Sequence, residues 1–439
     1  MNQETHEGIY DVRELGTAKT AVLGVQHLFA MFGSTILVPL LTGLNVSTTL
    51  LFAGLGTLLF HLMTKGKVPA FLGSSFAFLG GYAAIAPLLE DGSSNAEMIP
   101  YACFGVACAG LLYLIMALLI RLFSAEKVMR FFPPIVTGPI IIAIGLTLSQ
   151  SAIDSCSAHW PTALVAIVVV VLCNIFGKGM IRIIPILIGV IASYVVGAAL
   201  GQVDFTPVAE APLLGFPIVK ELTVLGLFDD SFQPALLITS VVTIMPIALA
   251  TIVEHIGDIS AISSTTGRNY IQDPGLHRTL LGDGLATILA SLFGAPANTT
   301  YGENTGVLNL SRVYDPFVVR IAAVLAVILS FCPKFAAVIQ VMPKATVGGI
   351  SLILYGMISA VGVRNVVEHQ VDFAKSRNVI IAALILVLSI GINYSKAGAI
   401  IFHLAGVTIS LSGLATGALV GIVLNAILPD QDYDLDRYV

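Results

Sequence analysis

Three carboxylic acids stand within or beside apolar runs of this sequence. Glu254 and Asp258 lie late in the run "IMPIALATIVEHIGDIS", and Glu303 follows the short stretch "PANTTYG". The i, i+4 spacing of Glu254 and Asp258 places both side chains on one face of a helix. Ionisable groups inside a membrane are costly and usually mark a pathway or a proton relay. Because desolvation favours the protonated form of a carboxylic acid, such groups can exchange protons near neutral pH.

Simpler interpretations exist for each acid. Glu254 could end a helix at the membrane surface, Asp258 could be interfacial, and Glu303 could cap a helix, alone or while it also binds a ligand. His255 lies about 100° around the helix from Glu254, so we expect it to pack or to hydrogen-bond rather than bind a ligand. We expect Gln26–His27, in the middle of an apolar run, to make a buried hydrogen bond between helices.

The sequence contains no HExxH motif and no further cluster of metal ligands. We therefore expect neither a metal nor another cofactor. The five cysteines form no CxxC pair and lie mostly in apolar runs, which is typical of small core residues. No nucleophile motif or phosphate-binding loop supports an intramembrane enzyme.

Composition identifies the solvent of this chain as a lipid bilayer. Of its 439 residues, 56% are hydrophobic and 11% charged, and the mean hydropathy is +0.94. A soluble domain is about a quarter charged. With roughly 20 apolar residues per membrane helix, the chain divides into about fourteen spans. The net charge of -5 does not bear on nucleic-acid binding, but the sequence has no basic patch, so we expect no nucleic-acid partner.

The basic residues predict the orientation of these spans. If the N-terminus is cytoplasmic, the 21 lysines and arginines fall on the cytoplasmic side with four exceptions, which are Lys220, Lys334, Lys344 and Lys396. This is a strong positive-inside bias. An even number of spans then places both termini in the cytoplasm. The last of the predicted spans covers residues 400–428.

The two halves of the chain resemble each other. "FFPPIVTGPIIIAIGLTL" (131–148) matches "VMPKATVGGISLILYGMI" (341–358), and "VPAFLGSSFAF" (68–78) matches "APANTTYGENTG" (295–306) in small and hydroxyl residues. A third pair, with His27 over His255, keeps the same order. Because seven spans is an odd number, two halves of seven would be inverted relative to one another. Inverted repeats with interrupted segments in matching places are typical of transporters.

The two hydroxyl-rich stretches read as interruptions of membrane helices. Each has proline, then small residues, then a resumed helix, beginning near Phe76 in one half and Glu303 in the other. Extended backbone at membrane depth must line a cavity or be buried in protein. Helix N-termini offer unpaired N–H donors. Such donors beside carboxylate acceptors suit a small, flat, neutral solute with N–H and C=O edges, for example an amide or a nucleobase.

Several motifs resemble one known family, the nucleobase–ascorbate transporters (nucleobase:cation symporters), and within it the bacterial uracil permeases. The resemblance covers about residues 20–375. It is carried by "QHLFAMFGSTILVPLL", "GKVPAFLGSSFAF", "VEHIGD", "DPGLHRTLLGDG", "NTTYGENTGV", "ENTGVLNLSR" and "GGISLILYG". Glu303 favours uracil, since purine-transporting members generally have glutamine there.

The resemblance implies an all-α polytopic membrane protein of fourteen segments in two inverted seven-segment repeats, with short β-strands interrupting segments 3 and 10. It implies a core domain of segments 1–4 and 8–11 and a gate domain of segments 5–7 and 12–14. The corresponding boundaries are a cytoplasmic N-terminal tail (1–19), core (20–123), gate (124–200), extracellular loop (201–233), core (234–333), gate (334–428) and cytoplasmic tail (429–439).

The resemblance also implies the functional residues. The substrate contacts are Ser34, Phe76, Glu254, Tyr301, Gly302, Glu303 and Tyr355. Phe76 and Gly302 would offer backbone N–H groups, and Tyr301 and Tyr355 would shape the pocket. Proton coupling falls on Glu254, Asp258 and Glu303. Two positions depart from the usual pattern: Ser311 replaces a threonine, and Asp258 stands where a histidine is linked to proton coupling in a uracil permease.

The sequence therefore predicts a proton-coupled uracil importer of the cell (cytoplasmic) membrane that works by alternating access. The partners expected are uracil, protons, the lipid bilayer and a second copy of the chain, bound through the gate domain. A transporter of another nucleobase (xanthine or uric acid) and an anion carrier of the same fold are the alternatives. An anion carrier would want basic rather than acidic pocket residues, and a channel would not saturate.

Overall fold

The computed structural model describes residues 8–89, 93–124, 127–128, 130–178, 180–228, 232–404 and 407–429. Within these ranges it does not describe the side chains of Met180, Ile183, Glu303 and residues 403–404 and 407–409. The described chain is predominantly helical. Seven of its helices are long and apolar enough to cross a membrane, or eight if the bent pair Pro316–Ser330 and Pro333–Gln340 forms one span.

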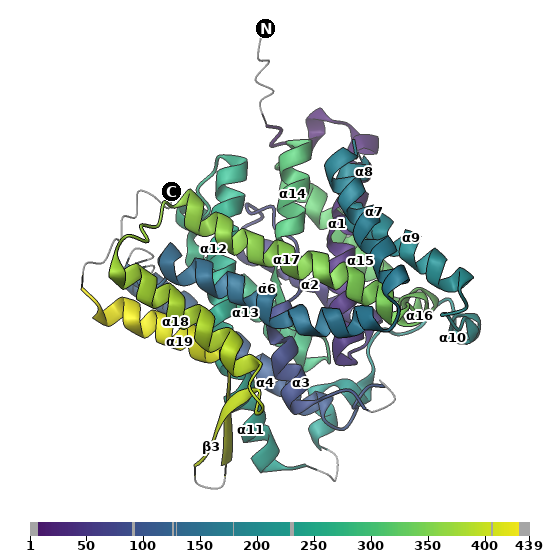
Figure 1. Ribbon diagram of the computed structural model, residues 1–439. Coiled ribbons are helices and arrows are strands. Elements are labelled where there is room, and N and C mark those ends of the chain that lie inside the picture. Colours follow the sequence, from purple (N-terminus) through teal and green to yellow (C-terminus); the bar gives the residue numbers. More distant parts are fainter. Residues whose placement is uncertain are drawn as a thin grey trace.

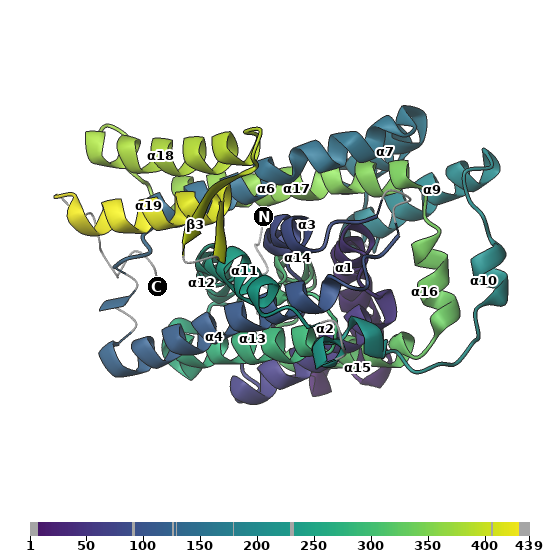
Figure 2. The same ribbon diagram turned by 90° about the horizontal axis from the view of Figure 1, so that it is seen from below.

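The helices form two layers that are seen side by side in Figures 1 and 2. The first layer contains α1 (Thr17–Thr42), α2 (Val46–Met63), α3 (Leu79–Ile85), α4 (Ile99–Phe123), α11 (Pro234–Ile244), α12 (Ala248–Thr266), α13 (Leu276–Leu292), α14 (Gly302–Ser311) and α15 (Pro316–Ser330). The second contains α6 (Pro134–Ser157), α7 (Trp160–Phe176), α8 (Met180–Ile183), α9 (Pro185–Ala199), α17 (Lys344–Glu368), α18 (Ser376–Asn393) and α19 (Gly413–Ile427). Two helices, α10 (Thr206–Glu210) and α16 (Pro333–Gln340), lie at one edge.

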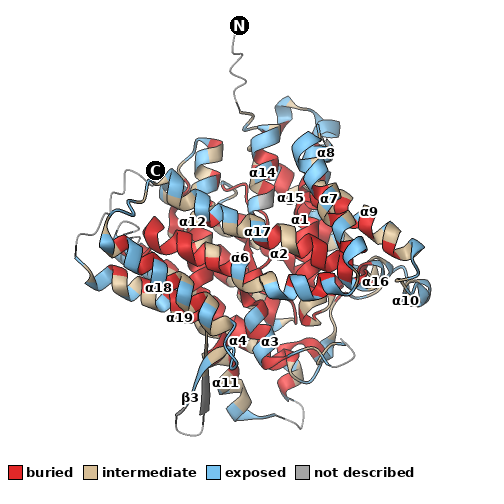
Figure 3. Ribbon diagram, viewed as in Figure 1, coloured by how far each residue is buried: buried red, intermediate tan, exposed pale blue. Residues whose placement is uncertain are grey.

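Pairs of helices from distant parts of the chain build each layer. In the first layer α4 packs on α13 and α2 packs on α15, and in the second layer α6 packs on α17. Figure 2 shows α1, α3, α12 and α14 between the outer helices of the first layer and the α6–α17 pair. The buried residues concentrate in these contacts (Figure 3). Large apolar side chains such as Ile175, Phe176 and Val387 remain exposed on the outer faces, as expected where lipid is the solvent.

Two short strands pair with each other within the first layer. β1 (Leu72–Ser74) pairs antiparallel with β2 (Asn298–Thr300), with Leu72 opposite Thr300. A 3₁₀ turn, η2 (Phe76–Phe78), and then α3 follow β1, while α14 follows β2. The structure thus has a strand and a following helix in each of the two hydroxyl-rich stretches.

A threonine from a neighbouring helix completes the hydrogen bonding of each strand. The hydroxyl of Thr57 in α2 donates to the Leu72 carbonyl (3.2 Å) and accepts from the Leu72 N–H (2.9 Å). The hydroxyl of Thr287 in α13 makes the same two contacts with Asn298, at 3.1 and 3.2 Å. Because buried backbone groups need partners, the two threonines allow a two-stranded sheet to exist inside the protein. The contacts are equivalent in the two halves of the chain.

One predicted span is wrong. Residues 400–428 do not form a continuous helix: they contain the antiparallel strands β3 (Ala399–Leu404) and β4 (Val407–Ser412) and then α19. Figure 1 shows β3 projecting beyond the helices on the side away from the N-terminus. The strands are rich in β-branched and aromatic residues, which favour extended backbone, whereas hydropathy alone does not distinguish a strand from a helix.

Proline divides three further predicted spans. The segment 180–200 is broken into α8 and α9 before Pro185, and 336–360 into α16 and α17, which begins after Pro343. The segment 234–260 contains α11, a 3₁₀ turn at Met245–Ile247 and then α12. Proline lacks an N–H donor and its ring clashes with the preceding helical turn, so helices end or change type there.

Candidate functional site

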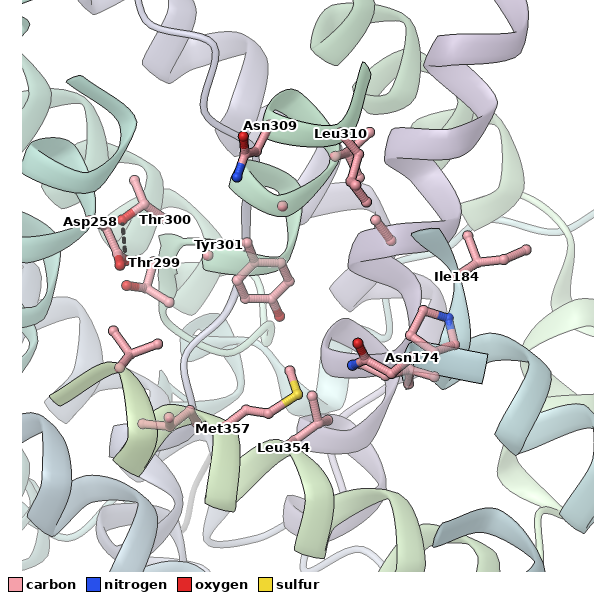
Figure 4. A pocket seen from close by; sticks show the side chains of 18 of the residues that line it. Asn174, Ile184, Asp258, Thr299, Thr300, Tyr301, Asn309, Leu310, Leu354 and Met357 are labelled. Carbon is pink, nitrogen blue, oxygen red and sulfur yellow. Dashed lines mark hydrogen bonds between the residues drawn. The ribbon is translucent and has the colours of Figure 1, made fainter. Parts of the chain in front are cut away.

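A cavity of about 440 Å³ lies between the two layers, where β2 turns into α14. The first layer contributes side chains from α1, η2, α12, β2 and α14, and the second layer contributes α6–α9 and α17. Of the residues predicted from the sequence, Phe76, Glu254, Asp258, Tyr301 and Gly302 line it. Figure 4 shows Tyr301 and Asp258 on the side of the first layer, with Leu354 and Met357 of α17 across from them.

The acidic wall of the cavity belongs to α12. Glu254 and Asp258 both line the cavity, as their i, i+4 spacing predicts. The hydroxyl of Thr300, the last residue of β2, donates to Asp258 Oδ2 at 2.9 Å (Figure 4). Asp258 therefore ties the helix that carries Glu254 to the strand that ends at the cavity.

Helix N-termini form a second wall, one that can donate hydrogen bonds. Tyr301 occupies the N-cap of α14 and Ser75 that of η2, and neither makes a side-chain capping hydrogen bond. The first N–H groups of a helix have no partner within the helix. Gly302, in the first turn of α14, lines the cavity, and a Cβ at this position would meet no other atom within 4 Å. An acceptor group can therefore approach the Gly302 backbone.

Tyr301 links the elements that meet at the pair of strands. Its hydroxyl donates to the Ser74 carbonyl at 3.0 Å and accepts from the Thr35 hydroxyl at 3.3 Å. The Ser74 hydroxyl in turn donates to the Thr35 carbonyl at 3.2 Å. Tyr301 contributes to the cavity wall, while its hydroxyl joins α1, β1 and β2.

Three of the predicted contact residues are not among the described side chains that line the cavity. Ser34 and Tyr355 are buried and are not among the described residues that line the cavity. Tyr355 lies behind Phe76, with ring centroids 5.6 Å apart and nearly perpendicular planes. Glu303 belongs to the first turn of α14, but its side chain lies outside the described part of the structure.

Two buried histidines make the contacts expected of packing residues. The Asn304 amide of α14 contacts His27 Nδ1 at 3.1 Å and donates to the His27 carbonyl at 3.0 Å, so the predicted interhelical hydrogen bond of the Gln26–His27 pair is confirmed. His255 is not among the described residues that line the cavity, and it contacts a neighbouring helix, in line with the prediction that it packs or hydrogen-bonds. Its Nδ1 lies 2.8 Å from Asp283 Oδ2 of α13, and both side chains are fully buried.

Sequence reasoning missed Asp283, the partner of His255. It also missed Thr300 and the second-layer residues Asn174 and Arg182, which line the cavity. An acid within the apolar segment "LLGDGLATILA" was a signal for Asp283. No comparable signal pointed to Asn174, because only the packing of the two layers brings it to the cavity. Within the described ranges, no group of three or more histidine, cysteine, aspartate or glutamate side chains could hold a metal ion.

The arrangement offers two kinds of hydrogen-bonding partner around a mostly apolar space. Carboxylates on α12 can accept from N–H groups, and the backbone at the start of α14 can donate to a carbonyl. This combination suits a small ligand with both kinds of edge. Half-helix ends and intramembrane acids around a central cavity are features of secondary transporters.

Comparisons with known proteins agree with this architecture. The transmembrane domain of a cyanobacterium bicarbonate transporter, BicA, superposes with a TM-score of 0.62 at 15% identity, over 95% of this chain and 99% of that chain. Murine Solute Carrier 26 family member A9, an anion transporter, gives a TM-score of 0.61 at 12% identity, over 95% and 69% of the two chains. These similarities show that the chain shares the fold of these two proteins.

In sequence, this chain is more similar to a group of bacterial permeases than to these two proteins. The uracil permease of Bacillus caldolyticus is 40% identical over 96% of this chain and 95% of its own length. The uracil permease of Escherichia coli (strain K12) is 36% identical over 93% and 91% of the two chains. A family model described as the permease family matches residues 18–398. This chain therefore belongs to the permease family of multi-pass membrane proteins.

Proposed function

We propose that this protein imports uracil together with protons across the cytoplasmic membrane by alternating access. The observation that carries the proposal is the meeting, in one cavity, of the Glu254 carboxylate and the start of α14 at Gly302. The names of the similar permeases support uracil as the substrate. Uracil is flat and neutral, and its edge alternates N–H donors with C=O acceptors.

Recognition of the base divides between side chains and backbone. Glu254 accepts from a ring N–H of uracil, and Glu303 is assigned the neighbouring N–H. The Phe76 and Gly302 backbone N–H groups donate to the ring carbonyls. Charge-assisted hydrogen bonds in a dry site are stronger than neutral ones, so the two carboxylates contribute most of the selectivity.

Coupling to protons follows from the position of the acids. A neutral solute accumulates against its gradient only with a coupled ion, and Glu254, Asp258 and Glu303 are the groups assigned to carry it. Two carboxylates one helical turn apart tend to share a proton, because ionising both in a low dielectric is unfavourable. Glu254 is our first choice for the group that takes up the proton, because it would both contact the substrate and lie one turn from Asp258.

We assign the first layer as a core domain and the second as a gate domain that moves against it. The equivalent threonine contacts of β1 and β2 support fourteen segments in two inverted repeats of seven, with the strands in segments 3 and 10. Both termini are then cytoplasmic. We also propose that two copies of the protein form a homodimer through the gate domain.

The test is uptake of labelled uracil into proteoliposomes, with competition by thymine, xanthine and uric acid. Saturable uptake blocked by uracil and its close analogues is the expected result. Block by xanthine or uric acid instead would assign another nucleobase. Uptake of labelled bicarbonate or chloride without uracil uptake would assign an anion carrier, against which the acidic wall of α12 argues. A rate that never saturates would indicate a channel.

A further inference from the structure

Residues 8–15, called here the N-terminal strap, pack across the C-terminal ends of α12 and α14. The Ile9 N–H donates to the Arg312 carbonyl at 2.8 Å, and the Tyr314 N–H donates to the Ile9 carbonyl at 2.7 Å. These bonds form a parallel bridge between Ile9 and Val313, directly after the last turn of α14. The strap therefore fixes the segment that connects α14 to α15.

Further contacts anchor the strap at the start of α15. The Val12 N–H donates to Asp315 Oδ2 at 3.0 Å, while Asp315 Oδ1 caps α15 by accepting from the Phe317 N–H at 2.9 Å. The Val12 side chain is buried in the same apolar cluster as Val313. One carboxylate thus joins the strap to the helix that follows α14.

Tyr10 extends the strap to α12. Its hydroxyl donates to the carbonyl of Thr266, the last residue of α12, at 2.6 Å. Its ring lies 5.3 Å from that of Tyr314, and the Arg268 guanidinium carbon lies 4.1 Å from the centre of the Tyr10 ring. Tyr10 is the side chain through which one short segment holds both helices.

The two helices held in this way are those that form the acidic and donor walls of the cavity. Glu254 lies about 18 Å along α12 from Thr266, and Gly302 about 14 Å along α14 from its last residue, at 1.5 Å per residue. At the cavity the pair is tied by Thr300 and Asp258. At the C-terminal ends of the two helices it is held by the strap, so the separation of Glu254 and the Gly302 N–H is fixed at two points.

We propose that the N-terminal strap is a positioning element for the ligand site, with Tyr10 as its positioning residue. The inference rests on the proposed function in that uracil is the ligand whose binding reports the geometry. The contacts described above all lie within the first layer, so the strap moves with that layer and acts on affinity rather than on the motion between layers.

The test compares Tyr10→Ala and Tyr10→Phe with Arg13→Ala in the purified full-length protein. Arg13 belongs to the same segment, but its side chain is 91% exposed and pairs with Asp11 of the same segment, so its removal is the matched control. Tyr10→Ala should raise the uracil Kd about fivefold, since it removes the hydrogen bond to the Thr266 carbonyl and the ring contact with Tyr314. Tyr10→Phe keeps the ring contacts and should show a smaller increase. Arg13→Ala should bind as the wild type does.

Hydrogen exchange of the ligand-free proteins provides a readout that does not depend on the substrate. Tyr10→Ala should accelerate exchange in peptides covering 254–258 and 302–305, and Arg13→Ala should not. Faster exchange confined to 8–15, 266–268 and 312–315, with an unchanged Kd, would overturn the inference by reducing the strap to a local structural role. A slower transport rate at unchanged Kd would overturn it as well. If the wild type fails to bind uracil while Tyr10→Ala accelerates exchange at the cavity, the result contradicts the proposed function and supports the inference.

Discussion

Thr300 and Asp258 form a 2.9 Å hydrogen bond between the strand that ends at the cavity and the helix that carries its acids. Thr300 is a hydrogen-bond partner of Asp258, and Glu254, one turn earlier, lines the same cavity. Two neighbouring carboxylates in different surroundings take different roles in acid–base chemistry. The first prediction follows from this difference.

Asp258→Asn should keep uracil binding and equilibrative exchange, because the amide oxygen can still accept from Thr300. It should alter the pH dependence of active uptake, since one of the two neighbouring acids is lost. Wild-type uptake should rise as the external pH falls and collapse with a protonophore. The measurement is uptake into vesicles with an imposed pH gradient, with and without sodium. Sodium dependence without pH dependence would show that the proton assignment is wrong.

Glu254→Gln and Glu303→Gln should each weaken uracil binding while leaving expression and membrane insertion intact. Loss of a charge-assisted hydrogen bond costs about 1.5–3 kcal/mol, or roughly a 10- to 150-fold higher Kd. Uracil-dependent thermal stabilisation of the purified variants measures the effect. Stabilisation equal to that of the wild type in either variant would remove that residue from the binding site.

Gly302→Val should abolish uracil binding with little change in the Tm of the ligand-free protein. A Cβ at Gly302 meets no neighbouring atom within 4 Å and would extend into open space beside the cavity. The effect should therefore come from obstruction of the ligand. Gly391→Val on α18, where a Cβ also meets nothing, is the control and should bind normally. A large fall in Tm of the Gly302 variant would contradict this reasoning.

Thr57→Val and Thr287→Val should each lower the Tm of the protein. Each change leaves one buried strand N–H and one carbonyl without their hydroxyl partner, which costs about 1–3 kcal/mol. Thr42→Val is the control, because the Thr42 hydroxyl bonds to the Val38 carbonyl within its own helix. Thermal unfolding in detergent provides the comparison, and equal shifts in all three variants would argue against a special role for the strand contacts.

Asp283→Leu should destabilise the protein more than either threonine change. Removal of one member of a buried ionisable pair leaves the other, His255, without its partner, and such losses cost about 3–5 kcal/mol. The double variant His255→Leu with Asp283→Leu should recover part of the lost Tm, because two apolar side chains replace the pair. A double variant less stable than Asp283→Leu would indicate that the two residues do not act as a pair.

The sequence alone determined that this protein lies in a bilayer and that two acids of its cavity share one helix face. Composition identifies a bilayer protein, since a chain with 11% charged residues cannot cover itself with polar surface. Helical periodicity places Glu254 and Asp258 on one face and His255 on another, and this is a local property of α12 that needs no tertiary information. Proline and small residues mark where the backbone leaves the helix, as at residues 69–75 and 296–301.

Only the tertiary structure decided which distant segments meet. The pairing of Leu72 with Thr300, the contact of His255 with Asp283 and the strap from Tyr10 to Thr266 each join residues with no local relationship in the sequence. The predicted span at 400–428 contains β3 and β4 because hydropathy is a sum over side chains and does not report the backbone conformation. Packing of whole helices selects these contacts, so hydrophobic periodicity, which reports one element at a time, cannot supply them.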